Sequence, residues 1–182
     1  MSVPPAEAQD VIAFWREAGP KQWFAKDSAF DMAFRDRFAL LYSKASRGEL
    51  AHWRTTPEGA LAEILLLDQF PRNAFRNTPW AFATDARAVE AAATMVAGGQ
   101  DSQLPNDLRV FAYMPFEHSE SLADQDRAVA LITPISDEFA RHARAHRDLI
   151  VRFGRFPHRN DILGRPSMPD EISFLAEGGY RP

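Results

Sequence analysis

The sequence predicts an all-α protein of a single domain, built from antiparallel helical hairpins. Apolar residues recur at helical spacing along most of the 182 residues, and no run of alternating β-branched residues indicates a strand. Proline and glycine interrupt the periodic stretches at short intervals, which is typical of antiparallel helices joined by short turns. We expect one helical domain over residues 1–182, with an irregular segment at residues 154–168 packed back on the helices.

The most apolar stretch predicts a central helix that is buried on most sides. Between residues 60 and 67 only Glu63 is polar, whereas a surface helix would show a polar stripe. Thr56 is a suitable N-cap for this helix, and the Pro57 that follows it fits a first helical turn. We expect the helix to end at residues 70–73, where the sequence Phe-Pro-Arg-Asn contains a proline.

Asp68 is expected to bring a carboxylate into this core or to its edge. It shares a helix face with Leu61, Ile64 and Leu65. Because an isolated buried charge is costly, the side chain needs a cation as its partner. We expect that cation to be an arginine of residues 152–159.

The other helices are predicted from the same spacing, together with capping residues before them and glycine or proline after them. Gly19-Pro20, for example, follows the first helix, and Gly154 follows the last long one. The expected helical ranges are 6–18, 28–46, 84–96, 122–132, 137–153 and 169–176, with a single turn at 50–54 and a further helix that opens at Pro105 and is interrupted at Pro115.

Composition excludes several classes of protein and site. The chain has no cysteine, which rules out disulfides, thiolate metal sites and cysteine nucleophiles, and which fits a reducing compartment. Its formal net charge is −4, so nothing indicates general affinity for nucleic acid. The N-terminus has no basic, apolar signal sequence, and no apolar run approaches the ~20 residues of a transmembrane helix. We therefore expect a cytoplasmic protein that binds neither nucleic acid nor a membrane.

Three junctions share one pattern, in which an aromatic residue or methionine is followed by proline and then by a polar cluster. They are Phe70-Pro71-Arg72-Asn73, Met114-Pro115-Phe116-Glu117-His118 and Phe156-Pro157-His158-Arg159-Asn160. Proline frees backbone carbonyls and redirects the side chains that follow it. If the helices stack with their ends aligned, we expect the three polar clusters to lie together.

Such a cluster suits a small anionic or zwitterionic ligand. Its arginines would bind a carboxylate or phosphate, and a histidine oriented by a neighbouring carboxylate would transfer protons. The candidate catalytic residues are His118, Glu117 and His158, and the candidate ligand-binding residues are Asp68, Gln69, Arg72, Asn73, Glu120, Asp124, Arg155, Arg159 and Asn160. The same kinds of pair also hold irregular helix ends in place, so a purely structural network is the alternative.

His142 and His146 have the four-residue spacing of zinc ligands on a helix. However, Ala143 stands where a zinc peptidase would have glutamate, and His146 shares a stripe with apolar residues. We interpret His146 as a hydrogen-bonded histidine at the edge of the core. We predict neither a metal site nor a cofactor.

Four stretches resemble the hallmarks of the bacterial DUF924 family. They are Trp23-Phe24-Ala25-Lys26-Asp27, Leu65-Leu66-Leu67-Asp68-Gln69-Phe70-Pro71-Arg72-Asn73, Pro115-Phe116-Glu117-His118-Ser119-Glu120 and Arg152-Phe153-Gly154-Arg155-Phe156-Pro157-His158-Arg159-Asn160. The resemblance covers essentially the whole chain. It implies an all-helical fold of the tetratricopeptide-like superfamily, arranged as a right-handed array. Because the family is of unknown function, the resemblance implies no particular activity.

Two functional hypotheses follow. The first is a small-molecule site, binding or catalytic, at the three junctions. The second is a helical adaptor that binds a peptide or a partner protein in a concave groove, as tetratricopeptide-like folds often do. Exposed aromatic residues along a groove would favour the adaptor, whereas convergent histidine, arginine and carboxylate side chains would favour the small-molecule site.

Overall fold

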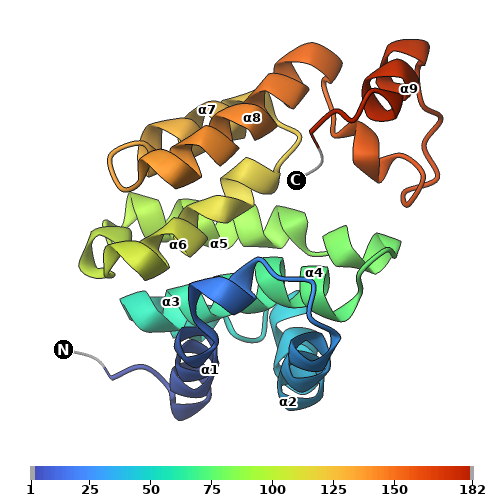
Figure 1. Cartoon of the computed structure of the whole chain (residues 1–182). Coiled ribbons are helices and arrows are strands. Elements are labelled where there is room, and N and C mark those ends of the chain that lie inside the picture. Colours follow the sequence, from blue (N-terminus) through green and yellow to red (C-terminus); the bar gives the residue numbers. More distant parts are fainter. Residues whose placement is uncertain (1–2, 181–182) are drawn as a thin grey trace.

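Helices pair and stack in chain order, so that the first and last pairs lie at opposite ends of the molecule (Figure 1). The computed structural model describes residues 3–180. Its helices are α1 (Ala6–Trp23), α2 (Ser28–Ser46), α3 (Pro57–Ile64), α4 (Phe70–Ala74), α5 (Asp85–Ala97), α6 (Asn106–His118), α7 (Leu122–Ile132), α8 (Asp137–Phe153) and α9 (Pro169–Ala176). Short 3₁₀ turns lie between them at Ala51–Thr55, Pro79–Phe82, Asp101–Gln103 and Pro157–Arg159.

The predicted fold class is confirmed, since residues 3–180 form one all-helical domain without a strand. α3 packs against α1, α5 and α6, whereas α6 packs against α7 and α8. The α5–α6 pair therefore lies between the N-terminal helices and the α7–α8 pair (Figure 1). A right-handed tetratricopeptide-like array stays a prediction. No helix in the described part of the chain is long and apolar enough to cross a membrane.

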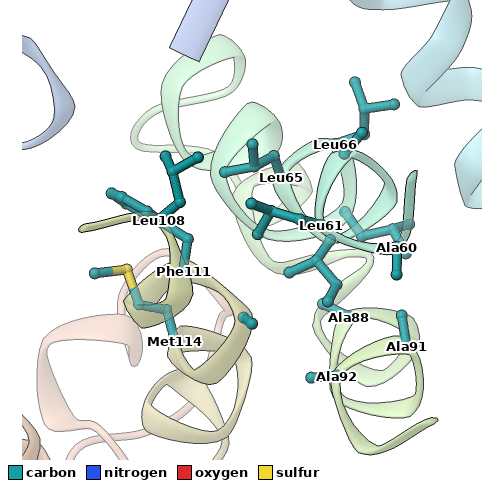
Figure 2. Close-up of a cluster of buried hydrophobic side chains, with 14 of the residues drawn as sticks. Ala60, Leu61, Leu65, Leu66, Ala88, Ala91, Ala92, Leu108, Phe111 and Met114 are labelled. Carbon is teal, nitrogen blue, oxygen red and sulfur yellow. The ribbon is translucent and has the colours of Figure 1, made fainter. Parts of the chain in front are cut away.

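The main hydrophobic core surrounds the central helix, as its apolar sequence predicts. Leu61, Leu65 and Leu66 are completely buried. Figure 2 shows the cluster that these leucines form with side chains of α5 and α6, among them Ala88, Ala91, Ala92, Leu108, Phe111 and Met114. Burying one such leucine contributes about 1.5–3 kcal/mol, so this interface is a main source of stability.

Most of the predicted helix boundaries are confirmed. The ranges 28–46, 122–132, 137–153 and 169–176 are those of α2, α7, α8 and α9. α1 extends beyond its predicted end, but Gly19 breaks its regular geometry with φ 69° and ψ 175°. Gly154 ends α8 with φ 70°, a left-handed conformation that glycine adopts without strain.

The central helix ends at Ala74, one residue beyond the predicted range 70–73, but Pro71 does not stop it. After α3 the chain forms one π-helical turn, Leu65–Gln69, and it then continues through Pro71 as α4. The backbone N–H of Phe70 accordingly donates to Leu65 O, five residues earlier. Because proline has no N–H, this shift of register accommodates Pro71 inside a buried helix.

The missing N–H of Pro71 leaves one carbonyl group of the helix to find another donor. In a regular helix that carbonyl would be the one of Leu67, four residues earlier. Here Thr84 Oγ1 donates to Leu67 O at 2.6 Å, from the residue immediately before α5. This hydrogen bond from Thr84, which replaces the missing N–H of Pro71, therefore links the central helix to the start of α5.

The next two carbonyl groups of the π turn accept hydrogen bonds from side chains of α4. Arg72 Nη1 donates to Asp68 O at 2.9 Å, and Asn73 Nδ2 donates to Gln69 O at 2.8 Å. Polar side chains are therefore drawn to this turn to satisfy its backbone.

Pro115 does not interrupt α6, so the break predicted there is wrong. The helix runs through Pro115 to His118. Its last turn therefore carries Glu117 and His118 as helical residues. Glu117 contacts α8, and His118 contacts the π turn.

The segment after α8 is held against the helices by a small second core and by ion pairs. Phe156 is completely buried and packs with Leu149 and Ile150 of α8. The N–H of Phe156 donates to Glu120 at 2.8 Å, and Glu120 also accepts two hydrogen bonds from Arg165. These contacts fix the position of the 3₁₀ turn that follows.

We expect Thr84→Val to lower the free energy of unfolding by about 1–3 kcal/mol, because the carbonyl of Leu67 would stay buried without this donor. Urea unfolding followed by circular dichroism measures the change. Thr94→Val is the matched control, since Thr94 Oγ1 donates to an exposed carbonyl of its own helix. It should change stability by less than about 0.5 kcal/mol. Equal losses in the two variants would contradict a special role for Thr84.

Candidate functional site

A buried carboxylate and a histidine form the centre of the candidate site. Asp68 lies on the π turn and is completely buried, and His118 is the last residue of α6. His118 Nδ1 lies 2.7 Å from Asp68 Oδ1. Because an ionised carboxylate only accepts hydrogen bonds, the imidazole proton is on Nδ1, and Nε2 is left as an acceptor. Two of the three predicted junctions therefore meet at this pair.

Asp68 has two further partners, both from its own helical stretch. Gln69 Nε2 donates to Oδ2 at 2.7 Å, and Arg72 Nη1 lies 3.1 Å from Oδ1. The predicted pairing with an arginine of residues 152–159 is wrong, because Arg72 lies one helical turn away and takes that place. The burial of the carboxylate and its pairing with an arginine are confirmed.

Asp85 connects this pair to the third junction. It is the first residue of α5, and its carboxylate accepts hydrogen bonds from both terminal nitrogens of Arg72, at 2.8 and 3.0 Å. Arg159 Nη1 lies 3.5 Å from Asp85 Oδ2. A continuous chain of contacts thus runs from Arg159 through Asp85, Arg72 and Asp68 to His118.

Arg159 is a buried cation with incomplete hydrogen bonding. Its side chain is 7% exposed, and its guanidinium lies 4.5 Å from the centre of the Phe82 ring and 4.4 Å from that of Phe156. Within residues 3–180 its buried Nε atom has no hydrogen-bond partner. Burial and the charge of Arg72 lower the pKa of Arg159 to about 10, which still leaves it charged at neutral pH. A charged guanidinium with free donors is well suited to a carboxylate or phosphate.

The surroundings keep the central pair as an ionised carboxylate and a neutral imidazole. Burial alone would raise the pKa of Asp68, but the charge of Arg72 and the contact with His118 outweigh it and lower that pKa below its usual range. Burial, with the charge of Arg72, lowers the pKa of His118, and Asp68 only partly offsets this. At neutral pH His118 is therefore an uncharged base held by a charged carboxylate.

A second carboxylate–histidine pair lies beside the first. Glu117 precedes His118 on α6, and its Oε1 lies 2.9 Å from Nδ1 of His146 on α8. The rings of His118 and His146 are 6.1 Å apart between centroids. His146 Nδ1 also lies 2.9 Å from His142 O, so the predicted hydrogen-bonded histidine at the core edge is confirmed. The sequence did not reveal Glu117 as its partner, since nothing local indicates that α6 ends against this face of α8.

Several predicted site residues instead belong to a network that holds the C-terminal segment. Arg155 forms a two-point ion pair with Glu171, and Asn160 Nδ2 donates to the same carboxylate. Glu120 is bound by Arg165 at 2.7 and 2.9 Å. These contacts use the polar groups within the protein, so we leave Glu120, Arg155 and Asn160 out of the proposed site.

The remaining predicted residues lie around the network rather than at its centre. Asp124 accepts a hydrogen bond from Ser119 Oγ at 2.7 Å, and Asn73 Oδ1 accepts one from Arg76 at 2.8 Å. His158 lines an open depression of about 500 Å³ between the 3₁₀ turn and α9. The role of His158 in catalysis and the roles of Asp124 and Asn73 in ligand binding stay predictions.

The two histidines with zinc-like spacing have other partners. His142 Nδ1 lies 3.1 Å from the hydroxyl of Tyr180, and His146 contacts Glu117. Across residues 3–180 no cluster of three or more histidine, aspartate or glutamate side chains could hold a metal ion. The described residues therefore offer no candidate metal centre.

Comparison with known proteins places the chain in a bacterial family. The family model described as "Bacterial protein of unknown function (DUF924)" matches residues 11–179. The chain belongs to the DUF924 family. A solved structure of a protein of unknown function from Agrobacterium tumefaciens is 48% identical in sequence, with a TM-score of 0.93 over 95% of this chain and 98% of that chain. No curated protein matches the sequence. In this DUF924 protein, three of the four stretches that suggested the family meet around Asp68.

We expect Asp68→Asn to destabilise this DUF924 protein by about 3–5 kcal/mol, because the buried Arg72 would lose one of its two carboxylate partners and His118 would lose its anionic acceptor. Chemical denaturation at pH 7 measures the loss. Asp126→Asn is the control, since Asp126 is exposed on α7 and pairs with Arg147 at the surface. It should cost less than about 1 kcal/mol. An unchanged denaturation midpoint for Asp68→Asn would show that the ion pairs of the Asp68 carboxylate do not stabilise the folded protein.

The lowered pKa of His118 predicts that the free energy of unfolding decreases on mild acidification. Because its pKa is lowered in the folded state, the unfolded chain binds a proton near pH 6.5 that the folded protein excludes. Stability therefore falls as the pH decreases from 7 to 5, by at most about 1.4 kcal/mol per pH unit for one proton. His118→Gln should make this decline shallower, whereas His52→Gln, at an exposed position, should not. Identical slopes for wild type and His118→Gln, from denaturation curves across this range, would contradict the lowered pKa.

Proposed function

We propose that this protein binds a small anionic or zwitterionic molecule beside Asp68 and His118 and transfers a proton to or from it. The observation that carries the proposal is the buried, ionised Asp68 that holds His118 by Nδ1 at 2.7 Å. Such a carboxylate fixes the tautomer and the orientation of an imidazole and stabilises the imidazolium that forms when a proton is taken up. A location in the cytoplasm, expected from the absence of cysteine, belongs to the same proposal.

The proton would be exchanged at His118 Nε2. The side chain of His118 is 16% exposed, whereas that of Asp68 is completely enclosed, so the histidine is the member of the pair that a ligand can reach. Because the pKa of His118 is lowered, the ring is neutral at physiological pH and acts first as a base. The proton that it accepts is then available to be returned to another atom of the ligand.

The ligand's anionic group would bind Arg159. A guanidinium between two aromatic rings keeps its orientation, and its unpartnered Nε supplies a donor that a carboxylate or phosphate oxygen would satisfy. The donors of Arg72, in contrast, are already used in ion pairs with Asp68 and Asp85. We therefore assign anion binding to Arg159 and positioning of Asp68 to Arg72.

The adaptor hypothesis has less support. A peptide groove of the tetratricopeptide-like kind would expose several aromatic side chains along one surface. Among residues 3–180, Phe24 and Trp80 are the large aromatic side chains that are mainly exposed, at 57% and 66%. Two such side chains do not form an aromatic groove, whereas the histidine, arginine and carboxylate groups around Asp68 lie together, which favours the small-molecule site.

Arg159→Met tests the anion-binding role. A thermal-shift screen of carboxylates and phosphates, beginning with succinate, glutamate and inorganic phosphate, should find a compound that stabilises the wild type. A ligand at a hundred times its Kd adds about 2.7 kcal/mol of stability. Arg159→Met should abolish that shift but keep or raise the stability of the free protein, since Asp85 remains paired with Arg72. His118→Gln should retain the shift and lose any turnover of the compound.

Arg165→Met is the matched control from the same segment. Arg165 donates to Glu120 at 2.7 and 2.9 Å, so its removal should cost about 1–3 kcal/mol of stability and leave the ligand-induced shift in place. If no compound shifts the wild type and Arg159→Met is destabilised as much as Arg165→Met, the small-molecule site is refuted and the adaptor hypothesis takes its place.

A further inference from the structure

An aromatic depression lies beside the start of α5, and its lining contains none of the groups proposed to bind a ligand beside Asp68. It has a volume of about 380 Å³ and lies where the C-terminal half of α2, the end of α4 and the start of α5 meet. Its lining includes the side chains of Tyr42, Ser46, Phe75, Trp80, Thr84 and Arg87. Neither Asp68, His118 nor Arg159 lines it.

Trp80 has an environment unlike that of the other tryptophans. It is 66% exposed, whereas Trp15, Trp23 and Trp53 are at most 7% exposed. A single exposed apolar side chain is ordinary on a protein surface. Trp80, however, lines a hollow together with Phe75 and Tyr42, and its exposed side chain can contact a ring that enters the hollow.

The aromatic lining is rigidly supported from below. The ring of Tyr42 stacks on that of Phe70 with centroids 4.8 Å apart, and it also packs against Phe75 at 5.5 Å. Phe70 is completely buried in the core. Tyr42 and Phe75 therefore hold fixed positions in the packing, and a ligand would not need to order these two rings.

Arg87 is the charged group of the lining, and the hydroxyl groups of Ser46 and Thr84 already donate to backbone carbonyls. Ser46 Oγ donates to Ser43 O at 2.9 Å, and Thr84 Oγ1 donates to Leu67 O. Arg87 forms no ion pair with any residue from 3 to 180. Its Nη1 lies so close to Gly48 that a Cβ there would be 3.1 Å away, which places the guanidinium against bare backbone.

The geometry points to a binding site for a small aromatic carboxylate in this depression. The ring would lie against Trp80 and Phe75, and the carboxylate would bind Arg87. An aromatic cation would be repelled by Arg87, and a ligand without a ring would leave the aromatic lining in water. The volume is within the range of small-molecule sites. This inference is independent of the proposed function, because the two sites share none of the groups that would bind a ligand.

The test is titration of the full-length protein with phenylacetate, using phenylacetamide as its uncharged counterpart and acetate as the counterpart without a ring. Isothermal calorimetry measures the affinity, and tryptophan fluorescence reports on Trp80, the one tryptophan that is mainly exposed within residues 3–180. We expect saturable binding of phenylacetate with quenching of the fluorescence. Phenylacetamide and acetate should each bind about tenfold more weakly or not at all, because a lost charge-assisted pair or a lost ring contact is of that order.

Two variants assign the binding to the depression. Arg87→Gln should weaken phenylacetate binding about tenfold and leave phenylacetamide unchanged. Trp80→Phe should keep calorimetric binding and lose the fluorescence response. Both side chains are exposed, so both variants should melt with the wild type. Arg16→Gln, at an exposed position of α1, is the matched control and should bind as the wild type does.

Three results would overturn the inference. One is the absence of a saturable signal with phenylacetate up to about 10 mM, which lies beyond the weakest affinity expected of a real site. Another is equal affinity for phenylacetate and phenylacetamide, or for the wild type and Arg87→Gln. The third is binding of a peptide that ends in phenylalanine without binding of phenylacetate, which would assign the depression to a protein partner.

Discussion

The proline within the buried central helix is the constraint on which the polar centre of the structure depends. Pro71 has no N–H, and the chain responds with the π turn Leu65–Gln69. A surface helix would leave the freed carbonyl groups to water, but here the turn is completely enclosed. Side chains must therefore supply the donors, and Thr84 and Arg72 do so. The same turn carries Asp68, so the defect in the helix and the buried carboxylate are parts of one arrangement.

Charge balance explains how the core tolerates this arrangement. Asp68 and Asp85 supply two negative charges, and Arg72 and Arg159 supply two positive ones, while the lowered pKa of His118 keeps that ring neutral. Buried ion pairs of this kind seldom add stability over apolar packing of the same volume, because the loss of hydration offsets their attraction. The freed carbonyl of the π turn accounts for Arg72, but stability gives no such reason to place Asp68, Asp85 and Arg159 beside a leucine-rich core. A role that needs fixed charges and a neutral base does give one.

Helices and their ends were predictable because their signals are local. Apolar spacing and caps gave the bounds of α2, α7, α8 and α9, as with Ser136, whose hydroxyl accepts from the N–H of Phe139. The interruption predicted at Pro115 was wrong, and the central helix passes through Pro71 before it ends at Ala74, because tertiary burial outweighs the local tendency of proline to end a helix. Within the candidate site, the shared pattern of the junctions indicated the polar residues but not their partners. Asp85 and Phe82 were missed, because they reach the network through the packing of α5 and the turn before it.

Two arginines of one short segment show how a binding group differs from a structural one. Arg165 donates to a carboxylate, to a side-chain amide and to a backbone carbonyl, and it is partly exposed, so water can reach its remaining donors. Arg159 is more deeply buried, yet it has one ion pair at 3.5 Å and an Nε without a partner in residues 3–180. Aromatic stacking on Phe82 and Phe156 stabilises the charge but leaves its in-plane donors unused. If stability were the only requirement, the more buried Arg159 would be expected to have all of its hydrogen-bond donors satisfied. The deficit at Arg159 is therefore where an incoming anion would gain the most from binding.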